Sequence, residues 1–452
     1  MWEKNWRDNV WSHIDQPWDI IVVGGGITGA GILRMATHLG LRVLLVEKKD
    51  FAWGTSSRST KLVHGGLRYL KQGQIGVTFH AVREREQLLK EGSGLIDPLG
   101  FLIATYRGDA PSKRMFRAGL ALYDLLASKW QHRYYSSDDF LMLAPHISTD
   151  RLKGGFGYYD GVTDDARLVL RVIREAVRNG GTALNYATVE GLLFDQVGRV
   201  NGILLRDQMT GRTAQVHARL VINATGAWAD QLRSQVGGQK RIRPSRGSHL
   251  IFPAWRFPVA QAVTLVHPLD RRPVFVLPWE GVTVVGTTDL DHHQPLDDEP
   301  QISREEVAYL MAAIGSKFPA LHLGVEDVLA TFAGVRPIIG TGKGDPAKES
   351  RVHAVWEENG LLTITGGKLT TFRLMALDTL RAAQHLLPDL ASLDGDMRIL
   401  DPLIPDLPGA VSLDGSARRR LLGRYGAEAP AVVANAGPVS YTHLRAHETV
   451  LD

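Results

Sequence analysis

Cysteine is absent from the 452-residue sequence. Its absence excludes disulfide bonds, thiolate catalysis, cysteine-ligated metals and iron–sulfur clusters. It also weakly favours a reducing compartment, because disulfides persist mainly in oxidising ones.

The sequence also lacks a strong net charge and a long hydrophobic run. Its 52 Lys and Arg residues nearly balance 48 Asp and Glu, which leaves a net charge of +4. Bulk charge therefore predicts no nucleic-acid partner. The longest apolar runs, such as residues 20–23, are far shorter than the about 18 residues that a membrane span needs. The N-terminus mixes both charges without an apolar segment, so we do not expect a secretory signal.

Hydrophobic residues make up 44% of the chain, enough for large cores, and the length suggests about three domains. The first 18 residues carry four tryptophans: Trp2, Trp6, Trp11 and Trp18. We expect this arm to pack against the body of the protein. The alternative is an interfacial membrane anchor, because tryptophan favours the membrane–water boundary.

A strand–helix–strand unit opens the folded part of the chain. Residues 19–23 predict a buried strand, residues 28–39 a helix and residues 42–47 a second strand. The glycine pattern of Gly24, Gly26 and Gly29 lies at the first turn, where a pyrophosphate can meet the helix N-terminus. Glu47 ends the second strand and suits ribose hydroxyls while repelling a 2′-phosphate. The unit therefore predicts NAD or FAD rather than NADP.

Three later segments favour FAD over NAD. Hydroxyl residues cluster at 55–60, just before a glycine-rich turn at 65–66, and suit a loop around phosphates and a flavin ring. Residues 223–228 follow another strand and bring the backbone close to the cofactor at its end. Residues 366–371 (GGKLTT) predict a helix N-terminus, where Lys368 suits the negative charge of a reduced flavin.

These segments carry a family resemblance over about residues 17–435. The most specific motifs are TSSRSTKLVHGGLRYL (55–70), DDARLVL (164–170), NATGAW (223–228), RGSHLIF (246–252), VFVLPWEG (274–281), VGTTD (285–289), GVRP (334–337) and GGKLTT (366–371). In this order they resemble the FAD-dependent glycerol-3-phosphate dehydrogenases, which belong to the D-amino-acid-oxidase-like flavoproteins. The resemblance implies an α/β fold: a Rossmann-type FAD-binding domain, an inserted mixed β-sheet substrate domain and a truncated helical C-terminal domain.

The expected domains are interleaved in sequence. Residues 1–18 form the arm. The discontinuous FAD-binding domain takes residues 19–90, 151–245 and 345–385, and the substrate-binding domain takes 91–150 and 246–344. Residues 386–436 begin the helical C-terminal domain. Residues 437–452 are expected to be a non-native tail, with a natural disordered tail as the alternative.

The resemblance also implies a reaction. Glycerol 3-phosphate is oxidised to dihydroxyacetone phosphate, and FAD passes the electrons to a membrane quinone. It implies a cytoplasmic protein, peripheral on the cytoplasmic face of the inner membrane, and allows a homodimer. Two alternatives stay open: an oxygen-using glycerol-3-phosphate oxidase or related amine oxidase of this fold, and a flavin-binding protein without turnover.

The predicted cofactor contacts lie in the glycine- and hydroxyl-rich segments and at the end of the second strand. They are Gly24, Gly26, Ile27, Thr28, Gly29, Glu47, Lys48, Thr55, Ser56, Ser57, Ser59, Lys61, Leu62, His64, Gly65, Gly66, Ala224, Thr225, Gly226, Gly367, Lys368, Leu369 and Thr370.

The substrate positions implied by the resemblance are Arg68, Tyr69, His249, Thr288, Arg336 and Lys368. Arginines suit a phosphate dianion because they stay charged and bind it through two nitrogens. A neutral histidine suits removal of a hydroxyl proton. His249 is the first candidate for this base and His64 the second; Arg336 and Lys368 complete the predicted catalytic set.

A histidine–aspartate cluster lies between the motifs. Asp289, Asp291, His292 and His293 look like metal ligands, but no second ligand group has a convincing spacing. We therefore expect a solvated loop and no metal.

Overall fold

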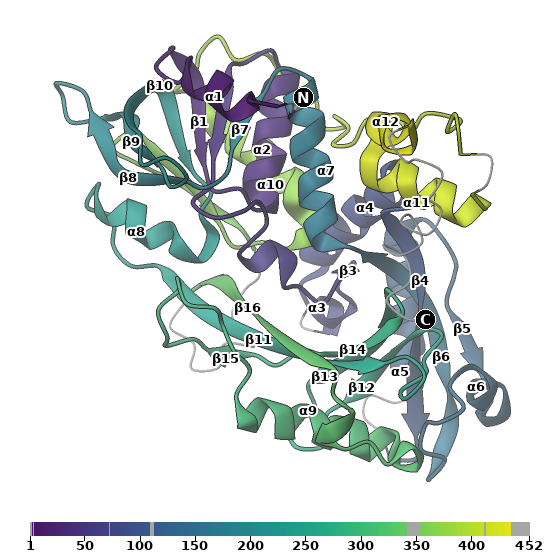
Figure 1. The fold of residues 1–452 in the computed structure, drawn as a ribbon. Coiled ribbons are helices and arrows are strands. Elements are labelled where there is room, and N and C mark those ends of the chain that lie inside the picture. Colours follow the sequence, from purple (N-terminus) through teal and green to yellow (C-terminus); the bar gives the residue numbers. More distant parts are fainter. Residues whose placement is uncertain are drawn as a thin grey trace.

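A computed structural model describes residues 2, 4–71, 73–108, 113–340, 352–410 and 413–434. Two large sheets organise it (Figure 1). The first sheet has the strand order β17-β18-β10-β1-β2-β7. Its strands are β1 (Trp18–Val23), β2 (Val43–Val46), β7 (Thr182–Leu184), β10 (Thr213–Asn223), β17 (Ala354–Glu358) and β18 (Leu361–Thr365). All pairs are parallel except β17 with β18.

Helices α2 (Ile27–His38), α7 (Asp165–Arg178) and α10 (Phe372–Ala383) cover one face of this sheet. Strand β1 is buried on both faces, because its alternate apolar residues contact the helices on one side and β8 and β9 on the other. β8 (Ala187–Phe194), β9 (Val200–Asp207) and the start of β10 form an antiparallel meander. The predicted strand–helix–strand unit is confirmed.

The second sheet has the order β15-β11-β14-β13-β12-β4-β6-β3, with β16 on β11 and β5 on β6. Its strands are β3 (Leu62–Val63), β4 (Ile96–Tyr106), β5 (Arg133–Tyr135), β6 (Leu152–Thr163), β11 (Ile242–Pro253), β12 (Ala262–Val266), β13 (Pro273–Trp279), β14 (Val282–Gly286), β15 (Leu290–Asp291) and β16 (Ala330–Ile339). The expected domain boundary at residue 151 is wrong for β6. This strand pairs with β4 along most of its length, so it belongs to the second sheet.

Helices cover both faces of the second sheet. α6 (Ser137–Leu143) and α9 (Arg304–Lys317) pack on one face, and α4 (Ile75–Glu91) and α5 (Lys113–Ala127) pack on the other. A capping box between Ser303 and Glu306 begins α9. α3 (Leu67–Lys71) lies between the two sheets (Figure 1).

The tryptophan-rich arm packs on the first sheet, as the favoured prediction had it. It contains α1 (Trp6–Trp11), and Trp11 and Trp18 are both buried. Trp2 stacks on Phe51 with ring centroids 5.6 Å apart. These contacts use the aromatic surface that an interfacial anchor would present to lipid.

α8 (Ala229–Ser234) follows β10, and α11 (Gly415–Tyr425) and α12 (Ala429–Ala434) end the described chain. The predicted tail, residues 437–452, lies outside the described residues. Across the described ranges, none of the helices has the length and apolarity that a membrane span requires.

Candidate functional site

A cavity of about 1890 Å³ lies between the two sheets. The carboxyl ends of β1, β2, β10 and β18 form one wall, and strands β12, β13 and β16 contribute to the other. Ligands of open α/β sheets bind outside the carboxyl ends of the strands. The position of the cavity therefore follows from the parallel order of the first sheet.

The glycine turn after β1 leaves no room for side chains. Gly24 has φ +114°, and a Cβ on it would lie 2.6 Å from the carbonyl oxygen of Ala224. The Ser56 hydroxyl accepts a hydrogen bond from the N–H of Ile27 at 2.9 Å, which ties the hydroxyl loop to the N-terminus of α2. The exposed backbone of this turn fits a pyrophosphate.

Glu47 lies at the end of β2, beside this turn. Its two carboxylate oxygens accept the backbone N–H groups of Gly25 and Lys49, each at 2.8 Å. Burial raises the pKa of the Glu47 carboxyl, while these N–H groups and the Lys48 ammonium lower it. Each carboxylate oxygen keeps lone-pair capacity for a ribose hydroxyl. The residues present therefore fit the adenosine half of FAD.

Most of the predicted cofactor residues line the cavity. They are Gly24, Gly26, Ile27, Thr28, Glu47, Lys48, Thr55, Ser56, Ser59, Leu62, His64, Gly66, Ala224, Thr225, Gly226, Gly367, Lys368, Leu369 and Thr370.

Four predicted cofactor residues lie behind the cavity wall instead: Gly29, Ser57, Lys61 and Gly65. Gly29 packs against the backbone of Gly24, where a Cβ would lie 1.9 Å from the oxygen. Lys61 is buried in an ion pair, and the N–H of Gly65 donates to Asp160 at 3.2 Å. Direct contact of these four residues with the cofactor stays a prediction.

Arg336 and Lys368 place positive charge on the cavity wall. Nη2 of Arg336 donates to the Thr287 hydroxyl at 2.8 Å, and Nη1 lies 3.4 Å from the Asp289 carboxylate. Nζ of Lys368 lies 3.6 Å from the ring centroid of Tyr69, which also lines the cavity. The two cations come from two separate sequence motifs, and both line this cavity.

The GGKLTT motif also holds the histidine turn. The Thr370 hydroxyl accepts from the N–H of His64 at 3.1 Å and lies 3.2 Å from the His64 carbonyl. Lys368 precedes a short 3-10 turn (Leu369–Thr371), and α10 begins directly after it. The helix N-terminus predicted at this motif is therefore present. Arg68 lies in α3 beside Tyr69, and its side chain is outside what the structure describes.

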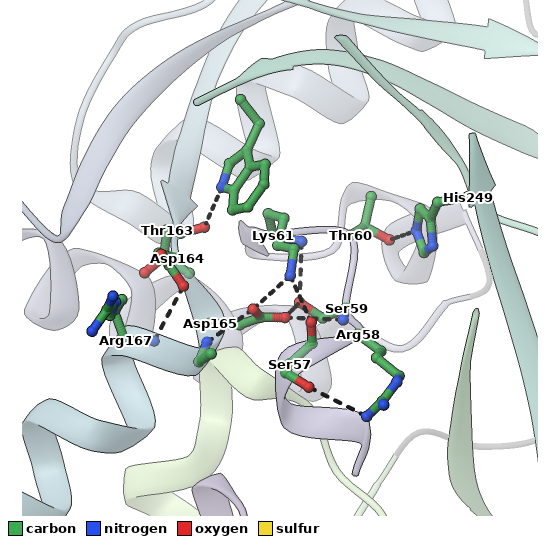
Figure 2. A network of polar contacts seen from close by, with 12 residues as sticks. Ser57, Arg58, Ser59, Thr60, Lys61, Thr163, Asp164, Asp165, Arg167 and His249 are labelled. Carbon is green, nitrogen blue, oxygen red and sulfur yellow. Dashed lines mark hydrogen bonds and ion pairs between the residues drawn. The ribbon is translucent and has the colours of Figure 1, made fainter. Parts of the chain in front are cut away.

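The structure corrects the placement of His249. Its side chain is 1% exposed, and the ring stacks on Phe332 with centroids 4.4 Å apart. The cavity wall does not include His249; it includes Thr60, whose hydroxyl lies 2.9 Å from Nε2 of His249 (Figure 2). Burial, together with the positive charges of Arg336 and Lys61, lowers the pKa of His249 well below its usual value. The imidazole is therefore neutral at pH 7.

Thr288 lines the cavity, but its hydroxyl is engaged elsewhere. The hydroxyl donates to Glu306 at 2.6 Å and accepts from the N–H of Ser248 at 2.9 Å. The neighbouring Thr287 hydroxyl is the one that contacts Arg336. The Thr288 hydroxyl thus ties Ser248 to Glu306 beside the loop that carries Thr287, and contact of Thr288 with the substrate stays a prediction.

The loop with Asp289, Asp291, His292 and His293 is less solvated than predicted. Asp291 pairs with Arg243 at 2.6 Å, and His292 is buried. In the described part of the chain, no group of three acidic or histidine side chains has a metal-binding arrangement.

Sequence reasoning missed two residues of this site. Thr60 stands within the hydroxyl cluster but was not singled out, although its neighbours were. Asp165 stands in the DDARLVL motif but was not singled out; its carboxylate accepts from the Ser59 N–H and hydroxyl and from Lys61 (Figure 2). The available signal was the acidic pair in the DDARLVL motif, of which Asp164 alone caps α7.

The cavity, the glycine turn and the acidic strand end define a dinucleotide-binding oxidoreductase of the Rossmann type. Residues 19–373 match the family of FAD dependent oxidoreductases (DAO), and the chain belongs to this family. FAD is its cofactor.

The relatives carry a narrower description. The chain is 42% identical over 382 residues to the aerobic glycerol-3-phosphate dehydrogenase of Staphylococcus epidermidis, which covers 82% of this chain and 68% of that protein. It is 40% identical over 367 residues to the protein of the same name from Staphylococcus aureus, covering 80% and 66%. The chain thus spans about two thirds of the length of these relatives.

Solved structures agree with the fold. The glycerol-3-phosphate dehydrogenase of Bacillus halodurans, complexed with FAD, superposes with a TM-score of 0.78 at 31% identity, covering 98% of this chain and 83% of that one. The L-alpha-glycerophosphate oxidase of Mycoplasma pneumoniae, with FAD bound, reaches 0.66 at 18% identity, covering 86% and 99%, and shows a shared fold.

Proposed function

We propose that the protein oxidises sn-glycerol 3-phosphate to dihydroxyacetone phosphate and passes the electrons to a membrane quinone. The observation that carries the proposal is the cavity itself: one continuous space joins the nucleotide turn at Gly24 to the two cations Arg336 and Lys368. A small phosphorylated alcohol beside a flavin needs this arrangement. The staphylococcal relatives, which are 40–42% identical in sequence and named glycerol-3-phosphate dehydrogenases, support the same substrate.

Arg336 is the proposed phosphate ligand. Thr287 and Asp289 hold its guanidinium from one side, and the side chain remains 25% exposed toward the cavity. A held guanidinium binds a phosphate with little loss of side-chain entropy, because its orientation is already fixed. Arg68, as the neighbour of Tyr69 in α3, is proposed as a second phosphate ligand.

Lys368 and His64 are proposed to act at the reacting end. FAD, when bound, accepts the hydride from C2 of the substrate at flavin N5. The ammonium of Lys368 lies over the Tyr69 ring beside the backbone of Gly66, and its charge stabilises electron density that arrives on the flavin. The His64 turn, fixed by Thr370, closes the wall near this lysine.

The electron acceptor is the finer part of the proposal. The motif resemblance supports a membrane quinone as the electron acceptor. A quinone acceptor would place the protein at the cytoplasmic surface of the membrane. The resemblance also allows a homodimer. The rival acceptor is oxygen, which the name of the Mycoplasma relative illustrates.

Turnover with glycerol 3-phosphate and a water-soluble quinone, with hydrogen peroxide measured in parallel, separates the two acceptors. We expect quinone reduction and little peroxide in air. Stoichiometric peroxide without added quinone would contradict the dehydrogenase assignment and establish the oxidase.

A further inference from the structure

We propose that Thr60 is a catalytic residue: its hydroxyl receives the C2 hydroxyl proton of the substrate and relays its own proton to Nε2 of buried His249. This proposal rests on the proposed function, and it identifies Thr60 as the group through which the base His249 acts on the substrate. Thr60 is the member of the pair that lines the cavity.

Burial keeps the His249 imidazole from direct contact with a ligand in the cavity. His249 lies between Phe332 and Gly286, and a Cβ on Gly286 would lie 2.1 Å from Cδ2 of the imidazole. The ring therefore has no room to turn toward the cavity. A base in this position reaches a cavity ligand only through a group that touches both, and the Thr60 hydroxyl at 2.9 Å is such a group.

The proposed phosphate site lies on the same face of β11 as His249. Gly247 and His249 lie on the same face of β11, because alternate residues of a strand share a face. The Arg336 guanidinium occupies the space above Gly247, where a Cβ would lie 1.9 Å from Nη2. The Arg336 guanidinium, which reaches over from β16, and the His249 side chain thus lie along the same face of β11. A phosphate on Arg336 brings the C2 hydroxyl of a three-carbon substrate toward Thr60.

Asp165 clamps the loop that carries Thr60 (Figure 2). The residues on both sides of Thr60 are tied to Asp165: Ser59 donates its N–H at 2.9 Å and its hydroxyl at 2.7 Å, and Lys61 donates its ammonium at 2.7 Å. The Asp165 side chain is fully buried. Held at both neighbours, Thr60 keeps its hydroxyl on His249 without an ordering cost at each turnover.

The proton and the electron pair balance. Neutral His249, with its own proton on Nδ1, accepts the Thr60 proton at Nε2, and Thr60 takes up the proton from the C2 hydroxyl. The C2 hydride leaves for the flavin and the C2–O bond becomes the ketone. The positive charges of Arg336 and Lys61 both oppose protonation of His249. A phosphate dianion bound to Arg336 offsets the first of these charges, so substrate binding assists the proton transfer.

The test compares Thr60→Val, which removes the hydroxyl at equal size, with Thr60→Ser, which keeps it. We expect anaerobic flavin reduction by glycerol 3-phosphate to slow about 100-fold in Thr60→Val and to stay within about threefold of wild type in Thr60→Ser. The FAD content and the dissociation constant of dihydroxyacetone phosphate, read from the flavin spectrum, should change less than about threefold. A wild-type rate in Thr60→Val, or equal slowing in both variants, would overturn the relay.

A double mutant tests the pair as a unit. Adding Thr60→Val to His249→Asn should slow reduction little beyond the slower single variant, since residues of one relay act together. If the rate losses of the two single variants multiplied in the double mutant, the pairing would be overturned. If the Thr60→Val protein fails to retain FAD, Thr60→Ala replaces it. Failure of the wild type to react with glycerol 3-phosphate would instead refute the proposed function.

Discussion

The guanidinium of Arg336 fills the space that a side chain at Gly247 would need, so that a Cβ on Gly247 would lie 1.9 Å from Nη2. The two residues belong to paired strands, β16 and β11. Any larger residue at position 247 must displace the proposed phosphate ligand.

Gly247→Ala should therefore weaken substrate binding while leaving the flavin in place. We expect the dissociation constant of dihydroxyacetone phosphate to rise about 10- to 100-fold, because one or two charge-assisted hydrogen bonds to the phosphate are lost. The FAD content should not change. Gly315→Ala is the matched control, because a Cβ there meets nothing within 4 Å. Equal binding in both variants would show that Arg336 does not hold the phosphate.

Removal of the positive charge at Lys368 should slow flavin reduction. Lys368→Met keeps the length of the side chain, and we expect reduction by glycerol 3-phosphate to slow about 10- to 100-fold and the flavin potential to fall. Stopped-flow absorbance and a redox titration measure the two effects. An unchanged potential would remove the electrostatic role of this ammonium.

Asp165→Asn should loosen the loop that carries Thr60. The substitution leaves Lys61 buried without its charged partner, which typically costs about 3–5 kcal/mol of stability. Denaturant unfolding measures this loss, and we expect weaker FAD retention to accompany it. Asp138→Asn, on an exposed position at the start of α6, is the control and should change stability by less than about 0.5 kcal/mol.

Stability should fall in mild acid partly because of His249. Its folded-state pKa lies below the unfolded value of about 6.5, so the unfolded chain binds the extra proton first as the pH falls. The contribution of His249 is thus complete above pH 6.5 and declines below it, by at most about 1.4 kcal/mol per pH unit. His249→Gln should flatten the pH dependence of the unfolding free energy between pH 6.5 and 5. A slope identical to that of wild type would place the imidazole in contact with solvent.

The nucleotide-binding half was predictable from local pattern. The first strand, the glycine turn and Glu47 lie within 30 residues, and their chemistry depends on nearest neighbours in sequence. Arg336 and Lys368 were recognisable from the GVRP and GGKLTT motifs, and Lys368 lies directly before a helical turn.

The pairing of the second sheet and the burial of individual side chains were harder to predict from the sequence. β6 was assigned to the wrong sheet because strand pairing depends on partners far away, here β4. His249 was expected on the cavity wall, but its depth follows from Phe332 on a strand about 80 residues later. Thr60 was missed for the same reason: its partner His249 is 189 residues away.

The most direct test of the account is anaerobic addition of glycerol 3-phosphate to the FAD-loaded protein, followed by the visible absorbance of the flavin. We expect the oxidised flavin to bleach in a single turnover, with one dihydroxyacetone phosphate formed per flavin. A flavin that stays oxidised with glycerol 3-phosphate but bleaches with lactate or an amino acid would contradict it.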